Sequence, residues 1–248
     1  EQGLGDTLQF CRYVSRLEAL GARVVLEVQR PLADLVSCIS PTAAVIAKGD
    51  ELPGFDFQCP LMSLPLAFNT LVDTIPAIPG YLLAPDTKQK AWHKKLGPTT
   101  RLRIGVAWSG NPEHTNDLNR SIALQTMLPL FEMKADFHCL QKEIRDGDAA
   151  TLAMLPQIKI WSNELRDFTD TAGLVTAMDL IISVDTAVAH LSAALGKPTW
   201  VMLPFAPDFR WLTGREDSPW YPTVHLFRQP HAGDWTSVIQ RVREALYN

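Results

Sequence analysis

The feature that most constrains the fold is a buried strand at residues 180–184 that runs directly into a helix opening with Asp185 and Thr186. Every residue of this strand except Ser183 is apolar, which is typical of a strand covered on both faces in a parallel sheet. Residues 187–195 continue with apolar side chains at helical spacing. We therefore expect a parallel α/β sheet, with Asp185 or Thr186 as the N-cap of the following helix.

The same junction is a candidate phosphate site. Free N–H groups in the first turn of a helix carry partial positive charge and favour an anionic ligand. His190 lies four to five residues into the helix and can face back toward such a ligand. Two plainer alternatives stay open: a capped helix that binds nothing, and a histidine that is merely packed or exposed.

Strand-like and helix-like patterns alternate in both halves of the chain, which indicates crossover units on parallel sheets. In the first half we expect helices at 6–20 and 31–39 and strands at 22–28 and 43–47, with Gly21 ending the first helix. In the second half we expect strands at 102–108, 136–140, 158–160, 180–184, 199–203 and 224–227, and helices at 123–133, 146–155, 170–178, from 185, and at 234–246.

A proline-rich passage at residues 50–85 separates these halves, with a possible strand at 55–59 and a polar helix at 86–96. The segment 97–100, Gly-Pro-Thr-Thr, has the composition of a linker. We place the boundary there and predict two domains, residues 1–98 and 99–248.

Composition narrows the class of partner and compartment. Lys and Arg number 23 against 27 Asp and Glu, so the net charge of −4 favours neither nucleic acid nor an anionic membrane as a partner. No apolar run reaches the roughly 18 residues of a transmembrane helix, and no signal peptide is visible. The cysteines form no C-x-x-C pair, which favours a reducing compartment, and we expect the cytoplasm. Because the chain opens on Glu1 without Met, we expect a fragment of a longer polypeptide.

A polar loop follows the predicted strand 102–108, at the strand end where doubly wound sheets bind their ligands. Ser109 and Asn111 offer hydrogen bonds, Gly110 lets backbone approach closely, and Arg120 offers a two-pronged phosphate contact. An ordinary surface loop is an equal alternative for the segment as a whole.

Two further segments follow predicted strands. Gln141 and Lys142 come after strand 136–140, and Lys142 could neutralise a diphosphate or simply stay solvated. The aromatic residues at 205–221 suit the stacking of a nucleobase or sugar, and burial against the neighbouring domain explains them equally well. The acidic pair in Asp146-Gly147-Asp148 is weak evidence for a metal, and we expect it to cap the next helix.

The N-terminal segment places Gly3 and Gly5 before a helix, so that backbone can approach a ligand. It is not a dinucleotide fingerprint, because Leu8 stands where the third glycine is required. Asp6 is either the N-cap of this helix or a general base that accepts a proton from an attacking hydroxyl.

The combined motifs Glu1-Gln2-Gly3-Leu4-Gly5-Asp6, Trp108-Ser109-Gly110-Asn111-Pro112, Gln141-Lys142-Glu143, Asp185-Thr186-Ala187-Val188-Ala189-His190 and Gly196-Lys197-Pro198 resemble bacterial heptosyltransferase-like glycosyltransferases. The type found at the C-terminal end of tetratricopeptide-repeat proteins is the most similar, and the resemblance covers essentially the whole chain. It implies a GT-B architecture, an α/β fold of two Rossmann-like domains whose parallel sheets face each other across a cleft, with the donor bound mainly by the second domain and no required metal or other cofactor.

The resemblance also implies roles for individual residues. Asp6 matches the candidate base, with Gly3 and Gly5 on the acceptor side, while Asp185, Thr186 and His190 match the helix opening near the donor diphosphate. Ala187 departs from the family pattern, because heptosyltransferases usually have glycine there. The strand that should precede Glu1 is also missing from the chain.

The leading hypothesis is thus an inverting, metal-independent glycosyltransferase that uses a nucleotide sugar and a hydroxyl acceptor on a glycan or a protein. One alternative is a non-catalytic binding module attached to upstream tetratricopeptide repeats. A nucleotide-dependent oxidoreductase or epimerase is disfavoured by the incomplete glycine fingerprint.

Overall fold

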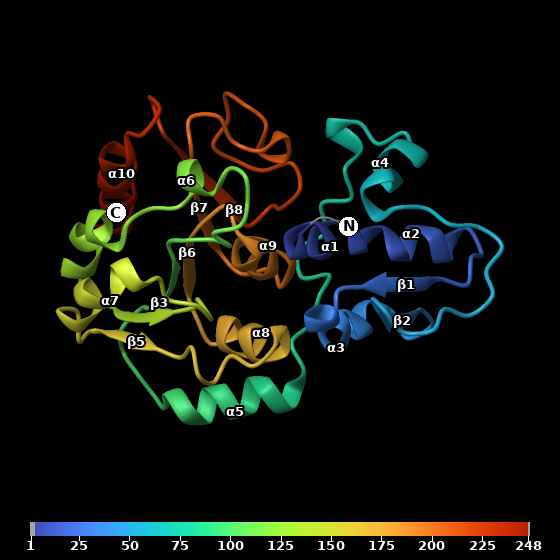
Figure 1. The fold of residues 1–248 in the computed structure, drawn as a ribbon, viewed down its shortest axis with the longest axis horizontal. Helices are drawn as coiled ribbons and strands as arrows, with labels where there is room; N and C mark the ends of the chain where they lie inside the picture. Colours follow the sequence, from blue (N-terminus) through green and yellow to red (C-terminus); the bar gives the residue numbers. More distant parts are fainter. Residues whose placement is uncertain (1–2, 248) are drawn as a thin grey trace.

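The computed structural model describes residues 3–247, which form a larger lobe around a six-stranded parallel sheet and a smaller lobe around a two-stranded one (Figure 1). The strands of the larger lobe are β3 (Arg103–Ala107), β4 (Asp136–Cys139), β5 (Ile158–Ile160), β6 (Leu180–Val184), β7 (Thr199–Leu203) and β8 (Val224–Arg228). Its helices are α6 (Asp117–Arg120), η6 (Leu124–Glu132), α7 (Asp146–Ala153), α8 (Phe168–Thr176), α9 (Ala187–Ala194), η7 (Phe209–Trp211) and α10 (Trp235–Tyr247).

The order of the large sheet is β5-β4-β3-β6-β7-β8, the doubly wound arrangement in which chain direction across the sheet reverses between β3 and β6. All five residues of β6 are buried, as their apolar composition predicts. Successive residues face opposite layers: Ile181 packs in the core that contains α8 and α9, and Ile182 packs in the core that contains η6 and α10. The sheet is thus covered on both faces.

Two local features of the larger lobe differ from expectation. The predicted α-helix at 123–133 is the 3₁₀ helix η6, which contains Pro129; proline lacks the N–H that an α-helix interior requires. Helix α8 begins two residues earlier than predicted, because the Asp167 carboxylate accepts hydrogen bonds from the backbone N–H groups of Thr169 and Asp170.

The smaller lobe contains α1 (Leu4–Phe10), the 3₁₀ turn η1 (Cys11–Tyr13), α2 (Val14–Ala19), α3 (Ala33–Val36) and the parallel strands β1 (Val25–Val28) and β2 (Ala44–Ala47). Gly21 follows α2 with a φ of 86°, as predicted for a glycine stop. The predicted strand at 55–59 is wrong: these residues are exposed loop, and Phe57 keeps 94% of its surface exposed. Short turns η4 (Leu61–Ser63), α4 (Leu64–Ala67) and η5 (Val72–Thr74) follow it.

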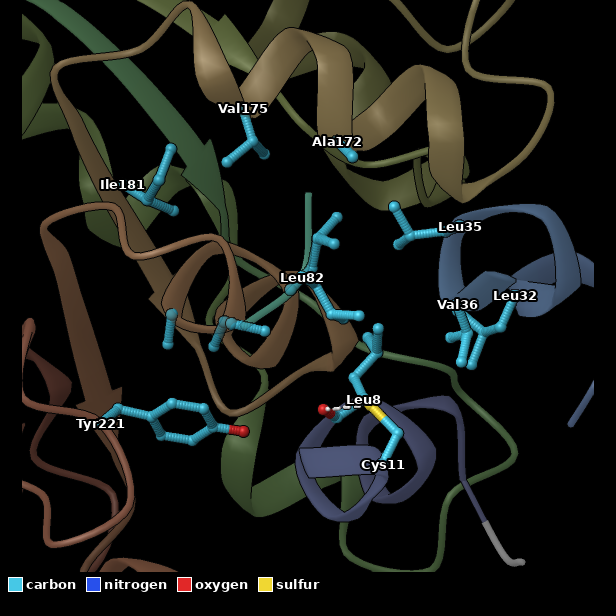
Figure 2. Close-up of a cluster of buried hydrophobic side chains, with 14 of the residues drawn as sticks. Leu8, Cys11, Leu32, Leu35, Val36, Leu82, Ala172, Val175, Ile181 and Tyr221 are labelled. Carbon is cyan, nitrogen blue, oxygen red and sulfur yellow. Dashed lines mark hydrogen bonds between the residues drawn. The ribbon is translucent and has the colours of Figure 1, made fainter. Parts of the chain in front are cut away.

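One apolar core runs through both lobes, as Figure 2 shows. Leu8 and Leu35 come from the smaller lobe, Leu82 from the connecting segment, and Val175 and Ile181 from the larger lobe. All five side chains are fully buried. The lobes are therefore in direct contact along this core.

Helix α9 contacts the first 82 residues near both of its ends. At its N-terminal half it packs against α1. At its C-terminal end the Leu82 N–H donates to the Ala194 carbonyl (3.1 Å), and Gly196, at a φ of +75°, lies so close to Gly80 that a Cβ would be 3.0 Å from the Gly80 nitrogen. Both contacts join segments far apart in the sequence.

The connecting helix α5 (Asp86–Leu96) has the predicted bounds and lies against α8 (Figure 1). Gly173 of α8 makes this approach possible, because a Cβ there would lie 2.7 Å from the Trp92 ring. Helix α5 precedes residue 98 in sequence but packs on the larger lobe. The domain boundary at residue 98 stays a prediction. Within residues 3–247, no helix has the length and apolar character needed to span a membrane.

Candidate functional site

The carboxyl ends of β3 and β6 lie side by side at the point where the strand order reverses, with Ala107 paired to Ser183. The loop 109–121 leaves β3, and α9 leaves β6 through Asp185 and Thr186. Thr186 takes the N-cap position without a side-chain capping bond, and its hydroxyl lies 3.2 Å from that of Ser183. The predicted strand-to-helix junction is confirmed here.

His190 is buried and contacts several polar and aromatic side chains, so the alternative of an exposed histidine is wrong. Its Nε2 lies 3.6 Å from Asp185 Oδ1, its Nδ1 lies 2.8 Å from the Tyr221 hydroxyl, and its ring stacks on Trp211 at 5.3 Å. Burial lowers the pKa of His190, which favours the neutral ring. Burial alone would raise the pKa of Asp185, but hydrogen bonding to His190 and the positive charge of Arg210 lower it overall. The pair is therefore a carboxylate beside a neutral imidazole.

The side chain of Gln141 hydrogen-bonds the residues that follow β3. Its Oε1 accepts the backbone N–H groups of Trp108 (2.6 Å) and Ser109 (3.0 Å), and its Nε2 donates to the Ser109 hydroxyl (3.0 Å) and the Glu143 carbonyl. The structure thus brings the predicted residues Gln141 and Ser109 together and pairs them with each other. Their arrangement fixes the backbone from which the loop 109–121 starts.

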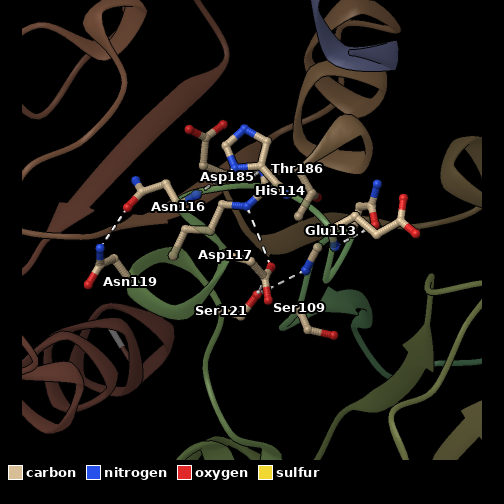
Figure 3. Close-up of polar contacts among 12 residues, drawn as sticks. Ser109, Glu113, His114, Asn116, Asp117, Asn119, Ser121, Asp185 and Thr186 are labelled. Atoms are coloured by element: carbon tan, nitrogen blue, oxygen red, sulfur yellow. Dashed lines mark hydrogen bonds and ion pairs between the residues drawn. The ribbon is translucent and has the colours of Figure 1, made fainter. Parts of the chain in front are cut away.

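Arg120 lies across the base of this loop. Its Nη1 donates to the Asp185 carbonyl (3.0 Å), and its guanidinium covers Gly110 so closely that a Cβ there would be 2.5 Å from Nη2. Asp117 anchors the same loop by accepting from Arg145 (2.6 Å) and Ser121 (2.7 Å). Figure 3 draws the polar side chains of the loop together with Asp185 and Thr186.

The other predicted donor-side residues lie at the rim. Asn111 is exposed, and its side chain accepts the Glu113 N–H (3.0 Å). Lys142 is exposed, and its ammonium donates to the Arg166 carbonyl (3.1 Å). Ala187, in the first turn of α9, is half-buried. These residues surround the β3–β6 junction without contacting one another through a hydrogen bond that the structure records.

Asp6 faces the same junction from the smaller lobe. It is the third residue of α1, whose N-cap is Gly3, so the interpretation of Asp6 as the N-cap is wrong. Its Oδ2 accepts the Gly3 N–H (2.8 Å), and its Oδ1 accepts from Arg210 Nη2 (2.7 Å). Its side chain keeps 10% of its surface exposed.

Gly5 does permit a close approach, and the partner is the other lobe. A Cβ on Gly5 would lie 2.7 Å from Cδ2 of His190. The helix α1 can therefore rest on the imidazole only because position 5 has no side chain. Gly3 serves as the N-cap.

Sequence reasoning assigned no role to Arg210, although it lies in the aromatic loop. The structure buries Trp211, Trp220 and Tyr221 of that loop, with Trp220 against Phe10 and Tyr221 beside Arg12 of the smaller lobe, while Phe205 and Phe209 stay exposed. Burial is thus the correct alternative for the first three. An arginine two residues after Asp208, in the loop that follows β7 at the carboxyl edge of the sheet, was the available signal.

The two aspartates after β4, Asp146 and Asp148, do not have the predicted capping role. Neither Asp146 nor Asp148 caps α7, whose N-cap is Arg145. Asp148 instead accepts the indole N–H of Trp108 (2.8 Å) and the Leu124 N–H (3.1 Å). In the part of the chain that the structure describes, no three His, Cys, Asp or Glu side chains converge to hold a metal. A metal-independent reaction stays a prediction.

Residues 165–202, from the approach to α8 through most of β7, match the model of Glycosyltransferase family 9 (heptosyltransferase). Protein FlbA of Caulobacter vibrioides is 26% identical over 272 residues, which cover 99% of this chain and 45% of FlbA. The chain thus spans about half the length of the curated relative it matches.

Two solved structures share the fold. The E. coli ADP-heptose LPS heptosyltransferase II superposes with a TM-score of 0.65 at 14% identity, covering 100% of this chain and 96% of that one. The E. coli heptosyltransferase WaaC with ADP-2-deoxy-2-fluoro heptose superposes with a TM-score of 0.55 at 13% identity, covering 99% and 98%. The predicted α/β fold of GT-B type, with parallel sheets, is confirmed, and the matches together support a glycosyltransferase.

Proposed function

We propose that the chain is an inverting glycosyltransferase that moves a sugar from a nucleotide-diphosphate donor to an acceptor hydroxyl without a metal. The observation that carries this proposal is the approach of Asp6 to the β3–β6 junction, where Arg210 joins it to the Asp185–His190 side. A carboxylate from one lobe thereby faces the helix terminus of the other. The family match over α8, β6 and α9 supports the same function.

The donor diphosphate would bind at the first turn of α9. The N–H groups there point along the helix axis toward the strand ends, and Ala187 and Val188 are only half-buried. Arg120, whose Nη1 donates to the Asp185 carbonyl, supplies positive charge beside this turn. Lys142, after β4, would add positive charge from the rim. The other donor-side residues are Ser109, Gly110, Asn111 and Gln141, which form the adjoining strand ends and loop. Compared with glycine, the methyl group of Ala187 leaves the diphosphate less room to reach the backbone amides of this turn.

In the proposed reaction Asp6 takes the proton of the acceptor hydroxyl as that oxygen attacks the anomeric carbon. The bond from this carbon to the diphosphate oxygen breaks, and its electron pair leaves with the nucleoside diphosphate. A single displacement inverts the configuration of the sugar. Negative charge grows on the leaving group, where the α9 amides and Arg120 stabilise it.

Asp6 has room for this role. A carboxylate offers about four lone-pair positions, and Gly3 and Arg210 occupy only two of them. The exposed tenth of the side chain is where an acceptor hydroxyl reaches it.

The test is calorimetry with UDP-, GDP- and ADP-sugars, followed by a transfer assay on the donor that binds. We expect one donor to bind and to be turned over. Asp6→Asn should keep donor affinity and lose transfer, while Asp34→Asn, an exposed aspartate of the same lobe, serves as the matched control. If no donor binds, the chain is a non-catalytic module, and an unchanged rate for Asp6→Asn excludes the base assignment.

Attachment to upstream tetratricopeptide repeats and a cytoplasmic location belong to the same proposal. The acceptor, a glycan or a protein, would be presented beside the smaller lobe, on the side of Gly3 and Gly5.

A further inference from the structure

Arg210 contacts three different partners with its three guanidinium nitrogens. Its Nε donates to Asp208 (2.7 Å), its Nη2 donates to Asp6 (2.7 Å), and its Nη1 lies 3.4 Å from Nε2 of His190. Only 10% of its side-chain surface is exposed. No other described residue links the proposed base directly to the proposed donor side.

Negatively charged side chains outnumber the single positive charge at this guanidinium. Asp6 and Asp208 both pair with it, and Asp185 approaches His190 at Nε2, the same ring nitrogen that Arg210 approaches. Burial would lower the pKa of Arg210, but the two paired carboxylates raise it, so the side chain is always charged. A single cation therefore holds two carboxylates, and its fork geometry fixes where they lie.

The position of Arg210 is set by its own loop rather than by Asp6. The Asp208 carboxylate also accepts the Arg210 backbone N–H (3.2 Å), and Trp211 stacks on His190. Arg228 of β8 donates to the carbonyls of Trp211 (2.6 Å) and Leu212 (2.9 Å), which holds the loop after Arg210. The loop thus presents the guanidinium rigidly to α1.

We propose that Arg210 is a positioning residue for Asp6, which orients the carboxylate toward the acceptor and ties it to the Asp185–His190 pair. This inference rests on the proposed function. Gly3 holds one oxygen of Asp6 and Arg210 the other, so the plane of the carboxylate is fixed, and its remaining lone pairs keep one direction. Without Arg210 the carboxylate would be free to rotate, and the proton transfer would lose its alignment.

The plainer role for Arg210 is a clamp between the lobes that affects folding alone. The two roles differ in what depends on Asp6. A positioning residue loses its effect on the rate once Asp6 is already disabled, whereas a clamp affects stability equally in both backgrounds.

The experiment measures kcat, donor affinity and urea unfolding for Arg210→Met, Arg210→Lys, Asp6→Asn and the double variant Asp6→Asn/Arg210→Met. Arg215→Met is the matched control, because Arg215 lies in the same loop and its side chain pairs, among residues 3–247, with Asp217 alone. We expect Arg210→Met to lower kcat on the order of 100-fold with donor affinity unchanged, because small misplacement of a catalytic group has effects of this size. Arg210→Lys should recover part of the rate, and the double variant should be no slower than Asp6→Asn.

Three results would overturn the inference: an unchanged kcat for Arg210→Met, a loss of donor affinity in that variant, or a double variant slower than Asp6→Asn by the full single effect. Should Arg210→Met fail to fold, Arg210→Lys decides alone, since it keeps the charge and loses the fork, and a wild-type kcat excludes positioning by geometry. A wild-type protein that binds and transfers no sugar overturns the proposed function itself. An active wild type with an inactive Asp6→Asn variant and an active Arg210→Met variant overturns only the positioning role.

Discussion

The first turns of α1 and α7 carry the same pair of residues in the same places. Gly5-Asp6 and Gly147-Asp148 both stand at the second and third helical positions, and both aspartates keep 7% of their surface exposed. The partners differ. Asp148 accepts two neutral donors of its own lobe, whereas Asp6 pairs with a guanidinium of the other lobe. Position and burial therefore leave the role open, and the partner distinguishes a structural acceptor from a candidate base.

The largest expected effect separates the two aspartates by activity. Asp6→Asn should lower kcat by about 10²–10⁴-fold, because it removes the proton acceptor. Asp148→Asn should leave the rate per folded molecule unchanged, because Asp148 contacts Trp108 and Leu124 within the larger lobe. Steady-state assays normalised to the folded fraction test this. Equal losses in both variants would remove the distinction.

A second test separates them by stability. Asp148→Ala leaves the buried Trp108 indole N–H and the Leu124 N–H without a partner, which should cost about 2–5 kcal/mol of unfolding free energy. Urea denaturation followed by tryptophan fluorescence measures it, with Asp146→Ala, an exposed neighbour, as the control. A cost below that of the control would contradict the structural role of Asp148.

The two glycines give a smaller and opposite pair of effects. Gly5→Ala places a methyl group 2.7 Å from the His190 ring, and should destabilise the protein by about 1–3 kcal/mol through overpacking. Gly147→Ala meets nothing within 4 Å, and should stabilise α7 by about 0.5–1 kcal/mol. Thermal unfolding compares them directly, and an unchanged or raised Tm for Gly5→Ala would show that the α1–His190 contact is not tight.

The smallest effect concerns the face of α1 next to Asp6. Gln9 is fully buried, and neither of its side-chain polar atoms has a hydrogen-bond partner within residues 3–247. Gln9→Met keeps the volume and removes the unpaired amide, and should stabilise the protein by about 1 kcal/mol. Gln141→Met is the contrast, since all of the Gln141 contacts are made, and it should destabilise. Destabilisation by Gln9→Met would mean that the amide has a partner in solution.

Much of the larger lobe was predictable from the sequence. The predicted bounds of β5, β6, β7 and α5 agree with the structure. Buried parallel strands are almost wholly apolar, so short apolar runs between helical patterns locate them well. The contact of Arg120, in the loop after β3, with the Asp185 carbonyl after β6 follows from the doubly wound order, which places the ends of β3 and β6 side by side.

The contacts between lobes were not predictable in the same way. Arg210 and Asp6 are 204 residues apart, and no local pattern connects them. The aromatic residues of the same loop suited stacking and burial equally, and only the packing of Trp211 and Tyr221 decides between them. Pro129 and the prolines around residues 55–59 were visible, but propensity and apolar content outweighed them in the predicted helix and strand.

Two attachments of α9 to the N-terminal part of the chain restrict how the lobes can separate. The helix is only about 12 Å long at 1.5 Å per residue, yet His190 at its middle meets Gly5 and Ala194 at its end meets Leu82. Moving the smaller lobe away from α9 would break the contact of Gly5 with His190 and that of Leu82 with Ala194 at once. The lobes are thus held together at two points of one short helix, and their separation requires both contacts to break.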